Sequence, residues 1–372
     1  MTRILHLYAG NLYGGVESYL VTLAKVRHLA PHAEPHFGLC FPGRLRDELS
    51  AAGATVHDLG AVRVRQPWTI LKARQRLKKL LREVEYAAVV THSCWPHAVF
   101  APVVRRAGVR LVNATHDVLA GRHWLDRWAA RMPPDMVIAN SRFTAGPAAR
   151  LFTQSPVEVC YLPVAARLST ERESVRAALK TPPGAVVILQ ASRLERWKGQ
   201  AVHLQALAML KGVPGWEAWF AGGPQKAGES EFDTELKTFA RQAGIADRVQ
   251  FLGQRSDVPA LMASADIYCQ PNTVPEAFGV AFIEALSAGL PVVASDAGGP
   301  AEIVTPDCGI LCPPGDAGAV SRALGRLIED SELRTALGPA GPAQAAQLCD
   351  PARQMTRLAE LTTGTTPHAR NG

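Results

Sequence analysis

Two glutamates with seven residues between them are the residues of this sequence best suited to chemistry. Glu276 follows a proline-rich turn, and Glu284 lies inside a short predicted helix that opens near Phe278. A carboxylate among apolar residues is costly to bury unless it is hydrogen-bonded, so Glu284 requires a partner. The backbone N–H groups of Phe278, Gly279 and Val280 at the predicted helix start could hold an anion. Together these groups could bind a phosphorylated sugar.

Two cations lie in a second loop between a predicted strand and a helix. Arg193 and Lys198 are five residues apart in the run SRLERWKG. The arginine fork and the mobile lysine charge suit the two phosphates of a diphosphate. A solvated surface loop is the alternative interpretation. The GxxxxGK[ST] phosphate-binding pattern is absent, which argues against a P-loop ATPase or kinase.

Three further residues lie at strand ends in the first half. His116 follows the predicted strand 109–113; a lone histidine is usually structural, but this position favours a ligand contact. Gly14 and Gly15 stand at the first strand-to-helix turn, where glycine lets a ligand approach the backbone. A tight turn that needs glycine is the alternative. The GxGxxG fingerprint is absent, so a nicotinamide cofactor is disfavoured.

These residues need elements to position them, and both halves alternate apolar strands with helices. The predicted fold class is α/β, with two Rossmann-like, doubly wound parallel-sheet domains. Two such domains facing each other would create one cleft at the carboxyl ends of their strands. The predicted strands are residues 4–8, 36–40, 55–59, 87–91, 109–113, 135–139 and 157–162, then 185–191, 216–222, 249–253, 266–270, 291–295 and 309–312.

The strand pattern stops between Pro163 and Pro183. We therefore predict a first domain over residues 1–168 and a second over residues 169–350. Residues 351–372 would form a last helix and a disordered tail. Whether that helix packs back on the first domain is left open.

Composition narrows the class of protein. The 372 residues are 47% hydrophobic and 20% charged, which is typical of a globular enzyme. No signal peptide or membrane span is recognisable. Seven cysteines without a CxxC pair indicate a reducing compartment, and no metal-binding cluster is evident.

A basic segment distinguishes the first half. The net charge is +7, and residues 63–82 hold eight lysines and arginines and no acid. Leucines at helical spacing predict a helix over residues 71–84 with one packed stripe and a basic face. A solvated face is one interpretation; the other is a dock for an anionic membrane or acceptor, with Trp68 at its edge. Nucleic acid is not expected, because no aromatic platform interleaves the charges and no recognition module is visible.

With these residues in view, the chain resembles the retaining glycosyltransferases of family 4, which have the two-domain GT-B fold. The resemblance covers nearly the whole chain, and its most specific motif is the glutamate pair within PEAFGVAFIEALSAGLPVVAS. Supporting runs are SRLERWKG, FAGGP, VQFLG and CGILCPPGD. Asn272 stands where the family often has serine, and no Asn-Gly pair follows Pro163.

The resemblance implies a role for each site residue. Glu276 would contact the donor sugar near the reacting centre, and Glu284 would hold the ribose hydroxyls. Arg193 and Lys198 would hold the diphosphate, and His116 would contact the sugar. The remaining donor-binding residues would be Gly14, Gly15, Phe251, Leu252, Phe278, Gly279 and Val280, with the base near Phe251 and Leu252.

We therefore expect a retaining, metal-independent hexosyltransferase. It would move a sugar from a UDP- or GDP-linked donor to a glycan, lipid-linked or small-molecule acceptor in cell-surface polysaccharide or glycoconjugate biosynthesis. The nucleotide sugar would be a co-substrate, and no cofactor is expected. A nucleotide-sugar epimerase of the same fold and a non-catalytic nucleotide-sugar-binding scaffold are the alternatives. The expected location is cytoplasmic, with peripheral attachment to the inner face of the membrane left open.

Overall fold

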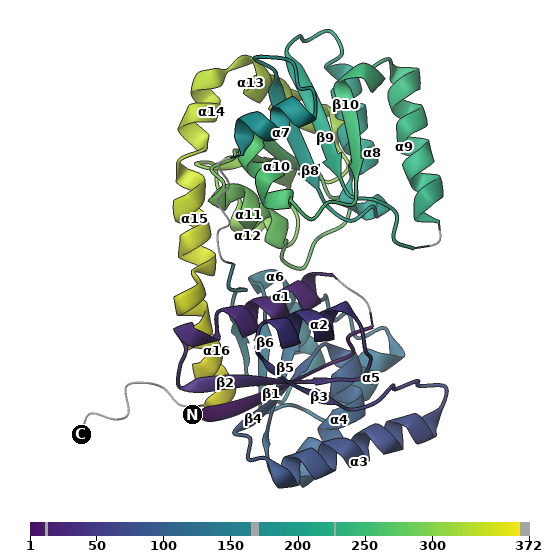
Figure 1. The fold of residues 1–372 in the computed structure, drawn as a ribbon, viewed down its shortest axis with the longest axis vertical. Helices are drawn as coiled ribbons and strands as arrows, with labels where there is room; N and C mark the ends of the chain where they lie inside the picture. The colour runs from purple at the N-terminus through teal and green to yellow at the C-terminus, as the bar shows by residue number, and fades with distance from the viewer. Residues whose placement is uncertain (12–13, 165–170, 227, 365–372) are drawn as a thin grey trace, which may run out of the picture. The chain divides into compact units, whose positions relative to one another are not determined.

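A computed structural model describes residues 1–11, 14–164, 171–226 and 228–364. The chain forms two compact units (Figure 1): unit 1 holds Met1–Ala165 with Cys349–Gly372, and unit 2 holds Ala166–Leu348. The predicted boundary between residues 168 and 169, and the predicted tail beyond residue 364, lie outside the described residues.

Unit 1 is a seven-stranded parallel sheet in the order β3-β2-β1-β4-β5-β6-β7. Its central strands are buried on both faces, as the apolar runs require. The strands are β1 (Thr2–Tyr8), β2 (Ala33–Leu39), β3 (Thr55–Asp58), β4 (Ala88–His92), β5 (Arg110–Thr115), β6 (Met136–Ala139) and β7 (Val157–Val159). The helices are α1 (Gly15–Lys25), η1 (Arg27–Leu29), α2 (Arg44–Ala51), α3 (Pro67–Glu83), α4 (Cys94–Arg106), α5 (Trp124–Ala130), α6 (Arg142–Leu151) and α16 (Pro351–Thr363).

Unit 2 is a six-stranded parallel sheet in the order β10-β9-β8-β11-β12-β13. The strands are β8 (Val186–Ala191), β9 (Trp216–Ala221), β10 (Val249–Gly253), β11 (Ile267–Gln270), β12 (Val292–Ser295) and β13 (Gly309–Cys312). The helices are α7 (Arg172–Ala178), η2 (Arg196–Lys198), α8 (Gln200–Met209), α9 (Glu229–Ala243), η3 (Ala246–Arg248), α10 (Val258–Ser264), α11 (Val280–Ser287), α12 (Pro300–Ile303), α13 (Ala317–Glu329) and α14 (Ser331–Leu337). A further helix, α15 (Ala340–Cys349), ends where the chain returns to unit 1.

The predicted fold class is confirmed, because both units are doubly wound α/β domains with parallel sheets. In each sheet the strand order reverses once, between β1 and β4 in unit 1 and between β8 and β11 in unit 2. Ligands of such sheets bind beyond the carboxyl ends of the strands at this reversal. The loops that follow these four strands are therefore the places to look for a site.

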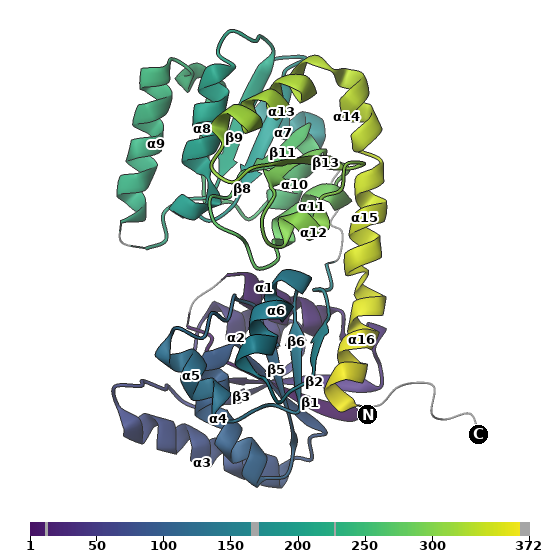
Figure 2. The ribbon, with the colours of Figure 1, turned by 180° about the vertical axis from the view of Figure 1, so that it is seen from behind.

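The last helix, α16, belongs to unit 1. It contacts η1, β4 and β6 and lies beside the sheet of this unit in both ribbon views (Figure 2). Its apolar side chains Met355, Leu358 and Leu361 are buried. The chain thus leaves unit 1 after β7 and returns to it for its final helix.

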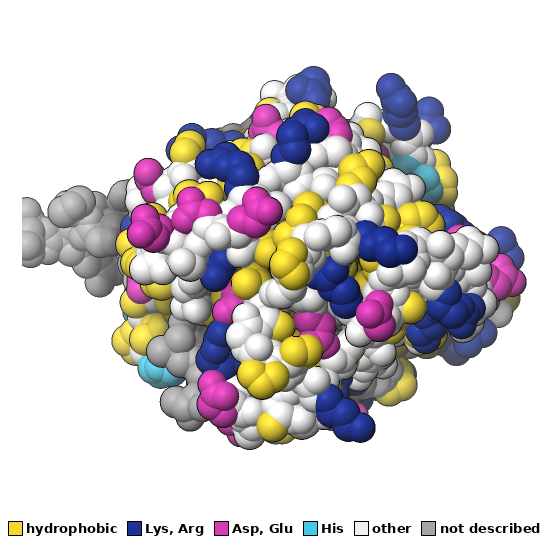
Figure 3. Space-filling model, turned by 90° about the horizontal axis from the view of Figure 1, so that it is seen from above, with side chains coloured by type: hydrophobic (Ala, Val, Ile, Leu, Met, Phe, Trp, Pro, Cys, Tyr) yellow, Lys and Arg dark blue, Asp and Glu magenta, His cyan; other side chains and the backbone are white. Residues whose placement is uncertain are grey.

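The surface is an ordinary solvated one on the face drawn in Figure 3. Basic and acidic side chains are interspersed there among apolar and uncharged ones. Interspersed charges of both signs are typical of a solvated protein surface. Within the described residues, no helix is long and apolar enough to cross a bilayer.

Candidate functional site

Glu276 and Lys198 meet where the strand order of unit 2 reverses. Glu276 lies in the loop between β11 and α11, and Lys198 ends the short turn η2 after β8. The Lys198 Nζ atom lies 2.5 Å from Glu276 Oε1. Two amides donate to the other carboxylate oxygen: Asn272 Nδ2 at 2.6 Å and Gln270 Nε2 at 3.1 Å. The carboxylate is thus held by one cation and two neutral donors.

This ion pair is largely withdrawn from water. The side chains of Lys198 and Glu276 are only 10% and 14% exposed. The ammonium also lies 4.2 Å from the centre of the Trp197 ring, and Gln190 donates to the Lys198 carbonyl at 2.8 Å. When an ion pair is removed from water, losing one partner strongly destabilises the folded protein, because the other charge is left buried and unpaired. Both charges are therefore fixed in place before any ligand arrives.

A buried polar network holds Gln270, one of the two amides that donate to Glu276. The Tyr268 hydroxyl lies 2.8 Å from Gln270 Oε1 and 3.1 Å from the Ala191 carbonyl. Burial, reinforced by the charges of Glu276 and Glu284, raises the pKa of Tyr268 well above its ordinary value, so the phenol stays protonated and donates. Sequence reasoning missed these supports, although polar residues at the end of a buried strand were a signal.

Two glycines fix the backbone of Glu276 from the other side. The Gly299 N–H donates to the Glu276 carbonyl at 2.8 Å, and Gly298 pairs with Glu276 as an isolated parallel bridge. A Cβ on Gly298 would collide with the Glu276 carbonyl oxygen and would lie 2.8 Å from its nitrogen. Gly298 and Gly299 therefore allow the backbone of the Glu276 loop to approach closely.

Replacing Gly298 with alanine should destabilise the protein more than replacing Gly315. Both glycines have a φ in the left-handed region, +72° and +77°, so each change adds roughly 1 kcal/mol of backbone strain. Only Gly298 adds a collision, because a Cβ on Gly315 meets nothing within 4 Å. We expect a lower melting temperature for Gly298→Ala than for Gly315→Ala, measured by calorimetry. Equal melting temperatures would contradict this packing.

The second predicted cation lies apart from this pair. Arg193 Nη1 contacts Glu195 Oε1 at 3.1 Å, and its side chain is 44% exposed. Glu195, which sequence reasoning did not single out, is only 18% exposed and also lies 3.8 Å from Lys226 Nζ. Arg193 therefore offers an accessible charge in the same loop as Lys198 but is not bonded to Glu276.

The predicted phosphate-binding helix start is shifted slightly. Helix α11 begins at Val280, with Gly279 as its N-cap at a φ of +100°, so Phe278 belongs to the preceding loop. The Gly279 and Val280 N–H groups are those at the helix start. Glu284 is half-buried on this helix. It is close enough to Tyr268 to contribute to the raised pKa of that group.

The predicted base-binding residues lie on strand β10. Phe251 and Leu252 are both half-buried near its carboxyl end. The Phe251 ring stacks on Phe220 of the neighbouring strand β9, with ring centres 5.4 Å apart. The two stacked rings could form one wall of a base site, and they belong to the same sheet as β8, the strand that precedes the Lys198 loop.

Gly14 and Gly15 begin helix α1 of unit 1. Gly14 is the N-cap, and its N–H donates to Glu17 Oε2 at 2.9 Å. A Cβ on Gly15 would meet nothing within 4 Å. The fold itself therefore does not require glycine at position 15, which leaves room for a ligand at the helix start.

His116 directly follows β5 and is buried. Its Nε2 lies 2.9 Å from Nδ1 of His92, the last residue of β4. Burial lowers the pKa of His116 from 6.5 to about 4, so the ring is neutral at physiological pH. A neutral imidazole can donate or accept one hydrogen bond through its other nitrogen.

Buried neutral histidines should make stability fall in mild acid. Burial lowers the pKa of His97 and His116 to about 4 and of His6 and His203 to about 3, against 6.5 when unfolded. The unfolded chain binds more protons below pH 6.5, so this stability is complete above pH 6.5 and is lost as the pH falls towards 4 and 3. At pH 5 each of these histidines lowers the free energy of unfolding by on the order of 2 kcal/mol. Denaturant unfolding at pH 7 and 5 measures the loss; equal stabilities would contradict it.

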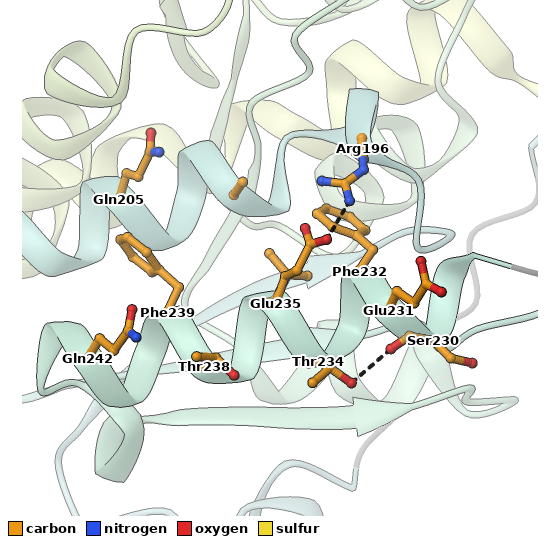
Figure 4. A pocket seen from close by; sticks show the side chains of 12 residues that line it. Arg196, Gln205, Ser230, Glu231, Phe232, Thr234, Glu235, Thr238, Phe239 and Gln242 are labelled. Carbon is orange, nitrogen blue, oxygen red and sulfur yellow. Dashed lines mark hydrogen bonds and ion pairs between the residues drawn. The ribbon is translucent and has the colours of Figure 1, made fainter.

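A roomy cavity lies elsewhere in unit 2. It has a volume of about 780 Å³ and opens between α8 and α9, with Phe232 and Phe239 in its wall. Figure 4 shows Arg196 and Glu235 reaching towards each other across one end, 2.8 Å apart. None of the predicted site residues lines it. The candidate site is therefore the group of residues at the strand ends, where Lys198 and Glu276 meet.

The described residues contain no group of three or more His, Cys, Asp or Glu that could hold a metal ion.

Helix α3, the predicted basic helix, begins earlier than expected, at Pro67. Trp68 and Leu71 in its first turns are 55% and 59% exposed. These two apolar side chains thus lie at the surface of the basic helix.

Two known protein families match this chain, and their matched ranges divide it at about the same place as the two compact units. Residues 13–167 match Glycosyltransferase Family 4, and residues 171–344 match Glycosyl transferases group 1. A GDP-mannose-dependent alpha-(1-6)-phosphatidylinositol monomannoside mannosyltransferase of Mycolicibacterium smegmatis is 29% identical over 84% of this chain and 88% of that protein. The lipopolysaccharide core biosynthesis mannosyltransferase LpsB of Rhizobium meliloti is 30% identical over 43% of this chain, a match that spans less than half of LpsB.

Solved structures give the same fold. Anabaena HepE in complex with UDP-glucose is 26% identical, with a TM-score of 0.84 over 98% of this chain and all of that one. A glycosyltransferase from Rickettsia africae reaches a TM-score of 0.88 at 20% identity, with 98% of each chain covered, which shows the fold alone. The predicted GT-B fold is thereby confirmed.

Proposed function

The chain belongs to the family 4 glycosyltransferases, and we propose that it transfers a hexose from a UDP- or GDP-linked donor with retention of configuration. The observation that carries the proposal is the contact between Lys198 and Glu276 at the strand reversal of unit 2. HepE was crystallised with UDP-glucose, and the mycobacterial relative is named for GDP-mannose. These names support the two donor classes.

The donor diphosphate would bind beside the loop after β8. Lys198 and Arg193 would approach its oxygens, and the Gly279 and Val280 N–H groups would add neutral donors. The half-buried Glu284 would hold the ribose hydroxyls. The base would rest near Phe251 and Leu252. In unit 1, the open space at Gly15 would admit part of the donor.

Charge develops in two places when the bond between sugar and phosphate breaks. Negative charge grows on the departing diphosphate, where Lys198 and Arg193 stabilise it. Positive charge grows on the sugar ring, and the Glu276 carboxylate is the group proposed to stabilise it. His116, as a neutral imidazole, would hydrogen-bond a sugar hydroxyl. The cations would thus carry the leaving-group role that a divalent metal has in other transferases.

A donor screen tests this function. The protein is mixed with UDP-, GDP- and ADP-sugars, and its melting temperature is followed because a bound ligand stabilises the folded state. Nucleotide release is then measured with and without added glycan or lipid acceptors. We expect stabilisation by a UDP- or GDP-sugar and acceptor-dependent release. Conversion of the donor alone into another nucleotide sugar would identify an epimerase, and binding without any turnover would identify a scaffold.

The acceptor is proposed to be a glycan or a lipid-linked sugar. The mycobacterial relative and LpsB are named for phosphatidylinositol mannoside and lipopolysaccharide core synthesis. An acceptor in a membrane would suit the basic helix α3 with its exposed Trp68 and Leu71. We propose a cytoplasmic enzyme that attaches to the inner membrane surface through this helix.

Vesicle binding checks the attachment. Lys78 and Lys79 are exposed on α3, so reversing both charges to glutamate should weaken binding to phosphatidylglycerol vesicles by about 3 kcal/mol or more. Binding of the unchanged protein should fall as salt rises. The control reverses two exposed charges of unit 2, Lys211 and Arg241. Salt-independent binding, or an equal loss in the control, would leave α3 as a solvated surface.

A further inference from the structure

Three buried histidines form a hydrogen-bonded chain across the centre of the unit 1 sheet. His6, His92 and His116 come from β1, from β4 and from the residue after β5, which are neighbouring strands. His6 Nδ1 lies 2.9 Å from His92 Nε2, and His92 Nδ1 lies 2.9 Å from His116 Nε2. The chain thus ends at the residue proposed to contact the donor sugar.

Packing prevents these rings from turning independently. The rings of His6 and His92 stack with centres 5.2 Å apart and planes 24° apart, and those of His92 and His116 stack at 5.2 Å and 18°. Tyr19 lies against both His92 and His116, and Phe37 lies against His6. All three histidines are less than 10% exposed. Each ring therefore has one orientation, and its nitrogens keep the same partners.

The proton positions in such a chain depend on each other. Burial lowers the pKa of all three rings, so each is neutral and carries a single N–H. His92 uses both nitrogens within the chain, so it accepts from one neighbour and donates to the other. The protons therefore lie on Nδ1 in all three rings or on Nε2 in all three. The nitrogen that His116 presents outside the chain is a donor in the first state and an acceptor in the second.

The surroundings of His6, at one end of the histidine chain, favour one of these two protonation states. His6 lines a small cavity of about 20 Å³ whose other lining residues are all apolar, among them Ile4, Leu23 and Met355. A water there would lack the two or more polar partners that hold a buried water. The other side chains that line this cavity contain no nitrogen or oxygen atom that could accept from an N–H on Nε2 of His6, and orphaned buried N–H groups are rarely tolerated. The state with every proton on Nδ1 avoids this cost.

We propose that His6 and His92 are positioning residues that hold His116 as a fixed hydrogen-bond donor towards the sugar. This inference rests on the proposed glycosyl transfer, in which His116 contacts the donor. His6 does not touch His116, so its influence passes through the His92 ring. A second nitrogen held by a fixed partner is how proteins set the tautomer of an imidazole.

A pair of nearly isosteric substitutions tests the chain. Asparagine at position 6 keeps an amide near the place of Nδ1 and can still donate to His92, whereas leucine cannot. We expect His6→Leu to lower kcat about tenfold, as the loss of an outer orienting partner does, with little change in the KM for the donor. His6→Asn should recover most of the rate. Leu5→Ala, on the opposite face of the same strand and equally buried, is the stability control and should keep kcat.

Nitrogen NMR of histidine-labelled protein gives a readout that needs no activity. In the unchanged protein, Nδ1 of His116 should show a protonated shift and Nε2 an unprotonated one. Couplings across the two N–H···N bonds should join His6 to His92 and His92 to His116. In His6→Leu the two His116 nitrogens should move towards averaged shifts, and in His6→Asn they should return.

The NMR and kinetic outcomes test the histidine chain and the proposed glycosyl transfer separately. If the enzyme shows no transfer with any donor, the NMR result still tests the chain, and the proposed function fails by itself. Unaltered His116 shifts in His6→Leu would overturn the inference. An unchanged kcat despite altered shifts would also overturn it, because the chain would then be only structural. If His6→Leu does not fold, missing couplings or an Nε2 proton on His116 in the unchanged protein would overturn the proposal.

Discussion

Replacing Glu276 with glutamine is expected to lower turnover about a hundredfold or more while leaving the donor bound. The carboxylate is fixed by Lys198, Asn272 and Gln270 before any donor arrives, so its charge is preorganised. Removing one such preorganised charge or donor typically costs 10²–10³ in kcat. Glutamine would keep the shape but would lose the charge that opposes the developing positive sugar.

The control for this substitution is a second ion pair of the same loop. Arg196 begins the turn that Lys198 ends, and it contacts Glu235 at 2.8 Å on the surface beside the α8–α9 cavity (Figure 4). Glu235→Gln removes a carboxylate from a basic partner without touching Glu276, so its rate should stay near that of the unchanged enzyme. Steady-state kinetics on both variants makes the comparison. Comparable rates for the Glu276→Gln and Glu235→Gln variants would mean that Glu276 takes no part in the chemical step.

Replacing Lys198 with methionine is expected to reduce kcat/KM by about a hundredfold or more and to weaken nucleotide binding. The ammonium would lose its role on the departing diphosphate, where a charged partner is stronger than a neutral one. Arg196→Met, from the same turn, should have little effect. Calorimetric titration of UDP and GDP, together with kinetics, separates binding from turnover. Unchanged nucleotide affinity and rate would contradict the proposed role of Lys198.

The double variant distinguishes chemistry from stability. Removing one partner leaves the other charge partly buried and alone, which costs about 3–5 kcal/mol in a well-buried pair and less here because both groups keep some exposure. Removing both should recover part of that loss, so the double variant should be more stable than the sum of the single changes predicts. Its activity should not recover. Recovery of activity with stability would mean that the pair acts only in folding.

Much of the fold was predictable, because buried parallel strands are runs of apolar residues bounded by turns. All thirteen predicted strands have a counterpart, with ends that differ by a few residues. The start of α11 differed because Gly279, with its positive φ, is the N-cap and excludes Phe278 from the helix. Helix ends depend on a single residue's conformation, which a pattern does not specify.

The individual site residues were predictable, but their contacts were not. Lys198 and Glu276 are 78 positions apart, and their contact depends on β8 and β11 being neighbours. Sequence reasoning assigned them to different parts of a donor and left Asn272 as a departure from the family. The chain from His6 to His116 was missed for the same reason, since strand order brings His6 within reach of His92 from 86 positions away.

We propose that the Lys198–Glu276 pair lies in the donor site, and a crystal structure with bound UDP or GDP would test this proposal. We expect diphosphate oxygens within hydrogen-bonding distance of Lys198 and Arg193, and ribose hydroxyls on Glu284. A nucleotide in the cavity between α8 and α9, or one that leaves Lys198 bound to Glu276 alone, would contradict it.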